Sequence, residues 1–353
     1  MTAADRILLG HGSGGKLYRD LVRDVFVAAF ANPVLDRLDD AASLATSGRI
    51  ALTTDSHVVQ PWRFAGGDIG LLAVAGTVND LATAAARPLA LAAAFIIEEG
   101  FFMDDLRAIC ASMARTAAEA GVAIVTGDTK VVERGAADGI FITTTGVGEI
   151  VVDHELGAQS VRDDDAVILS GSIGDHAMAV LAARDEFHFT TTVESDCAPL
   201  WGLAEAAIAA ARDTAPAAAA RDTAPASAAA LRFLRDPTRG GLTTVLAELA
   251  ESAALGVEIE ERAIPVSAAV RSICDLLGYE PLSLANEGKM VFVVAPEKAD
   301  AVVAALRAHP LGRHAARIGA ITAAHPGRVA LRTVLGTRRV LDMPVGELLP
   351  RIC

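Results

Sequence analysis

The sequence predicts an α+β fold made of two domains. Its 353 residues correspond to about two average domains, and a hydrophobic share of 52% can supply a core for each of them. Segments typical of strands and of helices alternate along the chain without one regular period, which favours α+β layers over a simple Rossmann array. We expect an N-terminal domain over residues 1–155, a C-terminal domain over 156–340 and a flexible tail over 341–353.

The N-terminal domain is expected to begin with a short apolar run and a glycine-rich loop at residues 10–16. Apolar residues recur at helical spacing after this loop. The expected helices of the domain cover residues 17–29, 71–86 and 104–113. The expected strands cover residues 49–54, 122–126 and 139–149, and the second of them opens into Gly127-Asp128-Thr129-Lys130.

The C-terminal domain is expected to begin its first strand at about residue 166, after a boundary near 160. We expect strands at 166–170 and 289–295 and a helix at 242–249. The segment 211–230 is rich in alanine and contains Ala-Arg-Asp-Thr-Ala-Pro twice. We interpret it as a low-complexity surface insertion without a catalytic role.

Composition excludes several classes of protein. A net charge of −13 argues against a general nucleic-acid-binding protein. No apolar run reaches the roughly 18 residues that a membrane span needs, and the first residues lack the basic-then-apolar pattern of a signal peptide. We therefore expect a cytoplasmic protein that binds neither nucleic acid nor membranes. The four cysteines form no Cys-x-x-Cys pair, so zinc and dithiol-redox sites have no support.

The glycine-rich loop nearly matches a phosphate-binding P-loop. Gly10, Gly15 and Lys16 fit the pattern, but Leu17 stands where a Ser or Thr hydroxyl would contact magnesium. Glycines still allow backbone N–H groups to approach phosphate oxygens. The loop is therefore a candidate for phosphate contact, and the alternative interpretation is an ordinary flexible turn.

Several carboxylates stand at turns or strand ends beside small residues, where they can reach a cleft. Carboxylate oxygens and nucleotide phosphates are the usual ligands of Mg²⁺, although a single Asp in such a place is more often a cap or turn residue. Composition alone does not show that these carboxylates lie close together in the fold. Lys130 and Glu287 also lie in glycine-flanked segments at strand edges. The candidate carboxylates are Asp40, Asp55, Asp80, Asp128 and Asp236.

The tail ends at Cys353 in the segment Pro350-Arg351-Ile352-Cys353. A thiol at that position can visit more than one site, as a tethered substrate or a carrier would. The alternative is a frayed end whose last residue has no role. An extended chain from Pro344 to Cys353 reaches about 30 Å at most, which is enough to move between an inner cleft and an external partner.

Taken together, the motifs of this chain resemble the HypE family of nickel–iron hydrogenase maturation proteins. They keep their order from residue 11 to the last residue, and the two most specific are Thr-Gly-Asp-Thr-Lys and Pro-Arg-Ile-Cys. The matching segments are 11–15, 31–33, 54–56, 79–80, 126–132, 134–138, 195–197, 239–241, 285–289 and 350–353.

The resemblance implies a two-domain PurM-like fold whose N-terminal domains pair in a homodimer, with ATP in the cleft between the domains. It implies that the loop closes over ATP and that carboxylates hold Mg²⁺ and the phosphates. The implied metal ligands are Asp40, Asp55, Asp80 and Asp236. The implied nucleotide-binding residues are Gly12, Ser13, Gly14, Gly15, Lys16, Asp55, Asn79, Asp80, Gly127 and Asp128.

The resemblance also implies a reaction. A HypF-type partner places a carbamoyl group on the terminal thiol of Cys353, ATP phosphorylates the carboxamide oxygen, and loss of the amide protons and phosphate leaves a thiocyanate. The nitrile carbon then passes to iron on a HypC–HypD complex. A base must remove protons from the amide nitrogen, and the family pattern assigns this step to Lys130 and Glu287 without deciding which of them is the base.

Two other functions remain open at this stage. The chain resembles the wider ATP-using superfamily, so a selenophosphate synthetase or a small-molecule kinase is one alternative. A selenophosphate synthetase usually carries a reactive Cys near the glycine loop, whereas the first cysteine here is Cys110. The other alternative is a non-enzymatic scaffold whose tail docks on maturation partners, and a titration with Mg-ATP would separate it from the enzymes.

Overall fold

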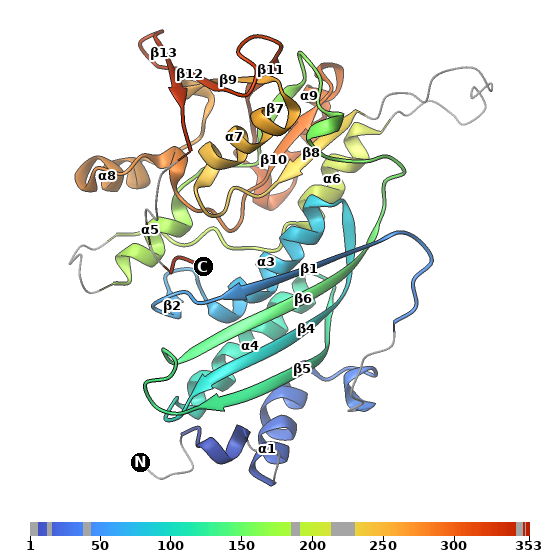
Figure 1. The fold of residues 1–353 in the computed structure, drawn as a ribbon, viewed down its shortest axis with the longest axis vertical. Coiled ribbons are helices and arrows are strands. Elements are labelled where there is room, and N and C mark those ends of the chain that lie inside the picture. The colour runs from blue at the N-terminus through green and yellow to red at the C-terminus, as the bar shows by residue number, and fades with distance from the viewer. Residues whose placement is uncertain are drawn as a thin grey trace.

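Two main sheets, each with its own helices, form most of the part of the chain that the structure describes (Figure 1). This computed structural model describes residues 6–12, 16–37, 44–184, 191–212, 230–343, 349 and 351–353. The expected α+β fold with two domains is confirmed. Most of the expected insertion at 211–230 lies outside the described residues. Among the described helices, none is both long and apolar enough to cross a membrane.

The N-terminal domain contains a four-stranded sheet in the order β1-β6-β4-β5. Neighbouring strands are antiparallel except for the pair β4 and β5. The strands of this domain are β1 (Ile50–His57), β4 (Ala86–Glu98), β5 (Ala123–Val132) and β6 (Ile140–Ile150), with the short pair β2 (Arg63–Phe64) and β3 (Gly67–Asp68).

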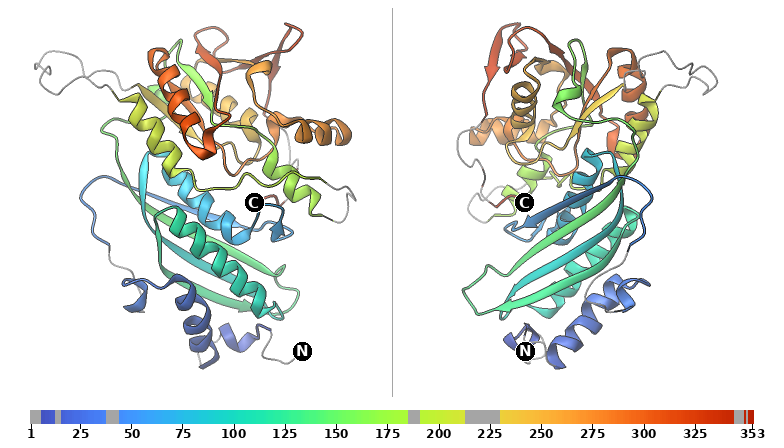
Figure 2. Two further views of the ribbon diagram at one scale, coloured as in Figure 1. Left: turned by 180° about the vertical axis from the view of Figure 1, so that it is seen from behind. Right: turned by 45° about the vertical axis from the view of Figure 1, so that its right-hand side comes forward.

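Two long helices, α3 (Ile69–Thr83) and α4 (Met103–Glu119), cover one face of this sheet (Figure 2). The side chain of Asp68 caps α3 by accepting a 2.9 Å hydrogen bond from the Leu71 N–H. The opposite face has no cover within the described chain, and Leu52 on β1 is 70% exposed there. This domain therefore has one buried face and one open face.

A helical segment before the sheet packs at the far end of the N-terminal domain, next to α4 and β5 (Figure 1). Its elements are a 3-10 turn (Leu9–Gly12), α1 (Lys16–Leu21), a π-helical stretch (Val22–Val27), α2 (Ala28–Phe30) and a 3-10 turn (Leu35–Arg37). The helix expected at 17–29 is thus confirmed, with a change of helical pitch inside it.

The C-terminal domain contains a seven-stranded sheet in the order β13-β12-β9-β11-β7-β10-β8. Its strands are β7 (Ala166–Leu169), β8 (Leu231–Arg235), β9 (Gly256–Glu260), β10 (Val291–Val294), β11 (Ala316–Thr322), β12 (Val329–Arg332) and β13 (Arg338–Leu341). Its helices are α5 (Asp175–Ala182), α6 (Trp201–Ala211), α7 (Gly241–Ala253), α8 (Ala268–Leu277) and α9 (Ala299–Ala308). Its 3-10 turns are Ala158–Ser160, Glu261–Ala263, Pro281–Ser283, Pro296–Lys298 and Pro310–Gly312.

Central strands of this second sheet are buried on both faces. Alternate residues of β10 enter two different cores: Phe292 packs with α6 and α9, and Val291 packs with α7. The first of these cores continues into the N-terminal domain, because α6 packs on α3. The two domains therefore share one hydrophobic core, and the loops between them are held in place by both.

Several predicted boundaries differ from the structure by a few residues, and the one that bears on the candidate site lies at β5. Strand β5 does not open into a loop at Gly127 but continues to Val132. Its last residues pair with β4, and Thr129 is buried opposite Phe95. Because Thr129, Val131 and Val132 are β-branched, this part of the chain favours the strand despite its glycine.

Candidate active site between the two domains

Four acidic residues approach one another where the two domains meet. Asp55 lies on β1 and Asp80 in the last turn of α3, while Asp236 follows β8 and Glu287 precedes β10. Burial, followed by the charges of Asp80 and Asp55, raises the pKa of Asp236 to about 7. The structure therefore brings together three predicted carboxylates, Asp55, Asp80 and Asp236, with Glu287.

Strand alternation and a glycine on α3 orient the two carboxylates of the N-terminal domain. Asp55 points towards α3, where a side chain at Gly76 would come within 3.3 Å of Asp55 Oδ2. Asp80 lies one turn beyond Gly76 and accepts a 2.7 Å hydrogen bond from Thr53 Oγ1. Burial raises the pKa of Asp80, and the charge of Asp55 adds to this effect.

Glu287 is the most deeply buried of the four carboxylates, with 3% of its surface exposed. Its Oε1 has no hydrogen-bond partner among the described residues. Burial, and then the charges of neighbouring carboxylates beginning with Asp236, raises the pKa of Glu287 well above its ordinary value. When ionised, a carboxylate with a raised pKa accepts a proton more strongly than an exposed carboxylate does.

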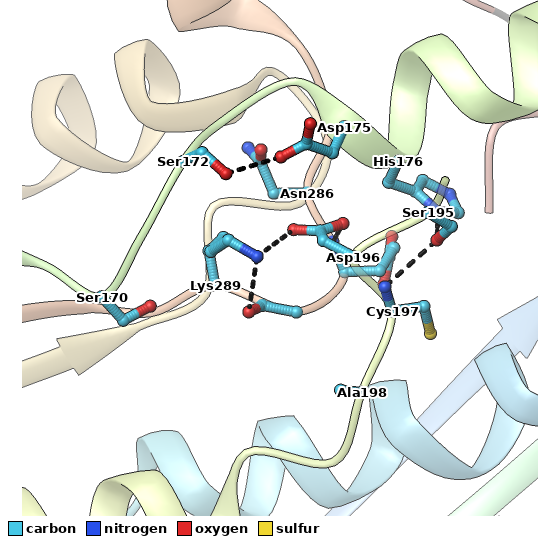
Figure 3. A network of polar contacts seen from close by, with 12 residues as sticks. Ser170, Ser172, Asp175, His176, Ser195, Asp196, Cys197, Ala198, Asn286 and Lys289 are labelled. Carbon is cyan, nitrogen blue, oxygen red and sulfur yellow. Dashed lines mark hydrogen bonds and ion pairs between the residues drawn. The ribbon is translucent and has the colours of Figure 1, made fainter. Parts of the chain in front are cut away.

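A buried ion pair supports the main chain around Glu287 (Figure 3). Lys289 Nζ lies 3.0 Å from Asp196 Oδ2, and Asp196 Oδ1 accepts a 3.2 Å hydrogen bond from the Glu287 N–H. Burial would raise the pKa of Asp196, but the charge of Lys289, together with weaker interactions, outweighs it and lowers that pKa. Gly288 allows its segment to pass close to the main chain at Asp196, because a side chain at position 288 would meet the Asp196 carbonyl oxygen at 1.6 Å.

Asn79, predicted to contact the nucleotide, uses its side-chain amide within the protein. Its Nδ2 donates to the carbonyls of Glu287 and Ala198 at 3.0 and 3.2 Å, and its Oδ1 accepts from the Leu200 N–H at 2.7 Å. The side chain is 1% exposed. Its contacts therefore join α3 of the N-terminal domain to the loop that carries Glu287.

The carboxylate cluster suits a hard cation. Its donors are all carboxylate oxygens, and their like charges disfavour ionisation of one another. No set of three side chains is already close enough to form a complete metal site within the described ranges. Mg²⁺ commonly takes one or two protein carboxylates together with phosphates and water, so this arrangement fits the ion. Asp40 lies outside the described residues.

Lys130 and Asp128 lie away from the carboxylate cluster formed by Asp55, Asp80, Asp236 and Glu287. Both are on β5, whereas Asp55 is on β1 at the opposite edge of the sheet, about 14 Å away across three strand spacings. Thr129 between them is buried on the helix side, so alternation places Asp128 and Lys130 on the open face. Lys130 Nζ donates to both oxygens of Asp128, at 2.9 and 2.7 Å. Within one chain these residues do not join the carboxylate cluster.

The described start of the glycine-rich loop borders the same edge of the sheet as Lys130. Its flanking 3-10 turn, Leu9–Gly12, packs against β5. Ser13, Gly14 and Gly15 lie outside the described residues, and Lys16 begins α1. Gly127 is on β5, where a side chain would meet the Ala93 carbonyl at 2.3 Å. The described flanks of the loop thus lie with Lys130 and away from Asp55.

Residues 351–353 of the tail lie against the protein close to the carboxylate cluster. The Val58 N–H donates to the Cys353 carbonyl at 3.1 Å. Val58 is three residues beyond Asp55, about 10 Å along an extended chain. The Cys353 side chain is partly buried and packs against the shared core.

Comparison with known proteins decides the family. Models of the AIR synthase related protein family match its N-terminal domain at residues 38–150 and its C-terminal domain at 162–332. Carbamoyl dehydratase HypE of Rhodobacter capsulatus is 49% identical over 352 residues, which cover 99% of this chain and 98% of that protein. The chain belongs to the HypE family.

Solved structures agree with this assignment to the HypE family. A crystal structure of a HypE in complex with ATP matches with a TM-score of 0.89 and 45% identity, over 98% of this chain and 99% of that one. A HypE from a HypE–HypF complex matches with a TM-score of 0.77 and 44% identity, over 92% and 99% of the two chains. The expected PurM-like fold and the resemblance to HypE are therefore confirmed.

Sequence reasoning missed three residues of this HypE-family site. His57 is buried beside Asp55, with 3.7 Å between Nε2 and Oδ2. His176 and Arg184 contact the tail. A histidine or arginine next to small residues carries no pattern of its own, so only the fold reveals that these side chains meet the tail and the carboxylates.

Proposed function

We propose that this chain is an ATP-dependent carbamoyl dehydratase that acts on its own Cys353 and supplies the cyanide ligands of hydrogenase iron. The carbamoylated thiol is the substrate. Phosphoryl transfer from ATP to the carboxamide oxygen makes that oxygen a good leaving group. Loss of phosphate and of the two nitrogen-bound protons then leaves S–C≡N on the same sulfur, with ADP as the other product.

The observation that carries this proposal is the docking of residues 351–353 on Val58 and Gln60, which follow the strand that carries Asp55, in a chain related to HypE over its whole length. A substrate attached to the enzyme makes the reaction intramolecular, which can raise its effective concentration greatly. The tail contacts Val58 immediately after β1, and β1 carries Asp55. A related HypE has been crystallised with ATP, which supports the choice of phosphoryl donor.

We assign the binding of ATP phosphates and Mg²⁺ to Asp55, Asp80 and Asp236, with Asp40 as a further predicted ligand. When bound, Mg²⁺ neutralises the charge that develops on the transferred phosphoryl group. Asp236 and Asp80 have raised pKa values without a cation. They therefore gain from a positive charge placed among them. Arg239 adds a fixed positive charge near Asp80.

The electrostatic surroundings favour Glu287 as the base. Its pKa is raised by burial and by its acidic neighbours, so it accepts a proton more readily than an exposed carboxylate. Lys130 has the opposite character, because its hydrogen bond with Asp128 raises its pKa and keeps it protonated. Lys130 is therefore suited to stabilise a developing negative charge, and Glu287 to remove the amide protons.

A second copy of the chain would bring Lys130 to the site. Lys130 lies on the open sheet face, which also exposes Leu52, Ile50 and Ile96. An apolar sheet face of this kind is typically covered by another sheet. We propose the homodimer that the sequence predicts, with the open faces paired and with β5 of one copy next to the carboxylate cluster of the other.

The remaining partners are part of the same proposal. A HypF-type carbamoyltransferase loads Cys353, in keeping with the complex formed by a related HypE. A HypC–HypD complex accepts the cyanide carbon. We place this exchange in the cytoplasm, as the sequence predicts.

Mass analysis of the intact protein tests this function. After incubation with the carbamoylating partner and Mg-ATP, the wild-type C-terminal peptide should gain a carbamoyl group and then lose one water. ADP should appear only when Cys353 is loaded. C353A should give neither the modified peptide nor ADP. C274A, which changes a buried cysteine on α8, should react normally. Normal thiocyanate formation by C353A would refute the proposal.

A further inference from the structure

The last three residues lie along the chain that follows β1. The Val58 N–H donates to the Cys353 carbonyl at 3.1 Å, and the Gln60 N–H donates to the Arg351 carbonyl at 3.2 Å. Arg351 is in the left-handed region, with a φ of 52°, so the segment is a turn and not an added strand. The carbonyl of Ile352, between the two bonded carbonyls, has a different donor.

His176 supplies that donor from the C-terminal domain. Its Nε2 lies 2.8 Å from the Ile352 carbonyl oxygen, and its ring is fully buried against Phe64. A carbonyl oxygen can only accept a hydrogen bond. The proton of the ring must therefore be on Nε2, which leaves Nδ1 as an acceptor while the ring is neutral.

Ser195 fixes this tautomer. Its Oγ lies 2.8 Å from His176 Nδ1 and accepts a 3.1 Å hydrogen bond from the Cys197 N–H (Figure 3). Since the backbone N–H occupies an acceptor position of the hydroxyl, the Ser195 O–H is available to donate to Nδ1. Burial lowers the pKa of His176 and keeps its ring neutral.

Other contacts hold the neighbouring residues from both domains. Arg184 donates through Nη2 to the Arg351 carbonyl and through Nε to the Gln60 carbonyl, each at 3.0 Å. The Arg351 side chain donates to the Val58 carbonyl at 3.0 Å and also bonds Asp138. Ile352 is only 5% exposed. The docked segment therefore bridges the two domains.

We propose that the His176–Ser195 pair positions the C-terminal segment by holding the Ile352 carbonyl, and so keeps Cys353 docked next to Val58. The main-chain bonds to Val58 and Gln60 hold residues 353 and 351, and the pair holds the residue between them. These are positioning residues, and their role in catalysis rests on the proposed function.

The alkylation rate of Cys353 measures docking without any need for turnover. The other three cysteines are at most 7% exposed, so iodoacetamide labelling of the full chain, resolved by peptide mass, reports the tail. We expect H176L to raise the rate about tenfold, which is the order of effect of one lost hydrogen bond to a buried carbonyl. H176Q keeps an N–H donor and should stay within about twofold of wild type.

S195A is the sharper variant, because Ser195 has no described contact with residues 351–353. Without this hydroxyl, His176 Nδ1 loses its hydrogen-bond donor, so the Nε2–H tautomer and the orientation of the ring towards the Ile352 carbonyl are less strongly held. We expect about a threefold faster alkylation. S172A removes a hydroxyl that bonds Asp175 at the start of the same helix, and it should leave the rate unchanged. S195A also serves as the test if H176L does not fold.

A single-turnover measurement then links docking to the reaction. With carbamoylated protein, H176L and S195A should form thiocyanate several-fold more slowly while the Kd for Mg-ATP stays unchanged, and H176Q should recover most of the rate. If wild type forms no thiocyanate, the proposed function fails, and the alkylation result still decides docking. Equal alkylation rates in wild type, H176L and S195A, or an H176Q variant as fast as H176L, would overturn the positioning role.

Discussion

At the scale of single residues, Asp236 illustrates how burial changes an ordinary carboxyl group. It follows β8 and is 7% exposed. Burial and the charges of Asp80 and Asp55 raise its pKa from 3.8 to about 7. In the absence of Mg²⁺ and ATP, the folded protein therefore binds a proton at Asp236 that the unfolded chain has lost between about pH 4 and pH 7.

The raised pKa of Asp236 fixes the direction in which pH changes the stability of the folded protein. A carboxyl pKa that is higher in the folded state makes stability greatest below the unfolded value and lowers it as pH rises towards about 7. We expect D236N to remove this loss, so that the ligand-free variant is more stable than wild type by about 1–3 kcal/mol at pH 8. At pH 4.5 the difference should be much smaller.

Urea denaturation at the two pH values checks this expectation for D236N. D104N, which changes an exposed carboxylate beside Arg107, is the matched control and should show little difference at either pH. The same variant D236N should bind Mg-ATP more weakly, because a proposed ligand is lost. A stability difference from wild type that is the same at pH 4.5 and pH 8 would contradict the explanation.

At the scale of secondary structure, the two faces of strand β1 have different roles, because successive side chains point to opposite sides of the sheet. Its odd-numbered residues face α3 and include Asp55 and His57, whereas its even-numbered residues lie on the open face and include Leu52. One strand thus contributes both to the proposed phosphate site and to the proposed dimer interface. A change on the open face should affect association first.

We expect L52K to weaken the homodimer by at least about tenfold, because a charge would be buried between two sheets. Sedimentation velocity over a range of concentrations gives the dissociation constant. L335K is the control, since Leu335 is 88% exposed in the turn between β12 and β13 of the other domain. An L52K protein that associates as tightly as wild type would exclude this face as the interface.

At the scale of the whole molecule, we expect the continuous core to make the two domains unfold together. Packing of α3 on α6 and the bonds of Asn79 join the N-terminal domain to the Glu287 loop. A nucleotide bound by carboxylates from both halves should stabilise the entire chain instead of one domain.

Calorimetry tests this cooperativity. We expect one unfolding transition, and Mg-ATP at about one hundred times its Kd should add about 2.7 kcal/mol. For a chain of this length that corresponds to a rise in Tm of about 3–4 °C. The shift should be much smaller for D80N. Two separate transitions, with only one of them moved by Mg-ATP, would show that the domains unfold independently.

Much of the fold follows from local patterns. Strands β1 and β6 have the alternation expected of half-buried strands, and the apolar stretch around Asn79 forms α3 as predicted. Strand β4 was not predicted, because its centre is rich in alanine, a residue with little preference for strands. Its position between β5 and β6 depends on tertiary pairing, which the sequence does not display.

The candidate site was predictable in composition and less so in arrangement. Asp55, Asp80 and Asp236 were expected at turns and strand ends; Asp236 does follow β8, whereas Asp55 lies within β1 and Asp80 within α3, and the structure brings all three together with Glu287. The separation of Lys130 from them follows from the strand order and from which side of β5 it occupies. The segment Gly127-Asp128-Thr129-Lys130 reveals neither property. A loop was expected there, and only a strand places alternate side chains on opposite faces of a sheet. The assignment of catalytic roles to these residues stays a prediction.

The contact between Asn79 and the Glu287 carbonyl has a practical consequence for protein engineering. A chimaera joined near residue 155 would combine two halves that each carry a complete sheet. The loop that carries Glu287 would nevertheless be held by the side-chain amide of Asn79 from the other parent protein. Recombined enzymes of this type should therefore be screened at this joint first, because halves that fold well need not fit each other there.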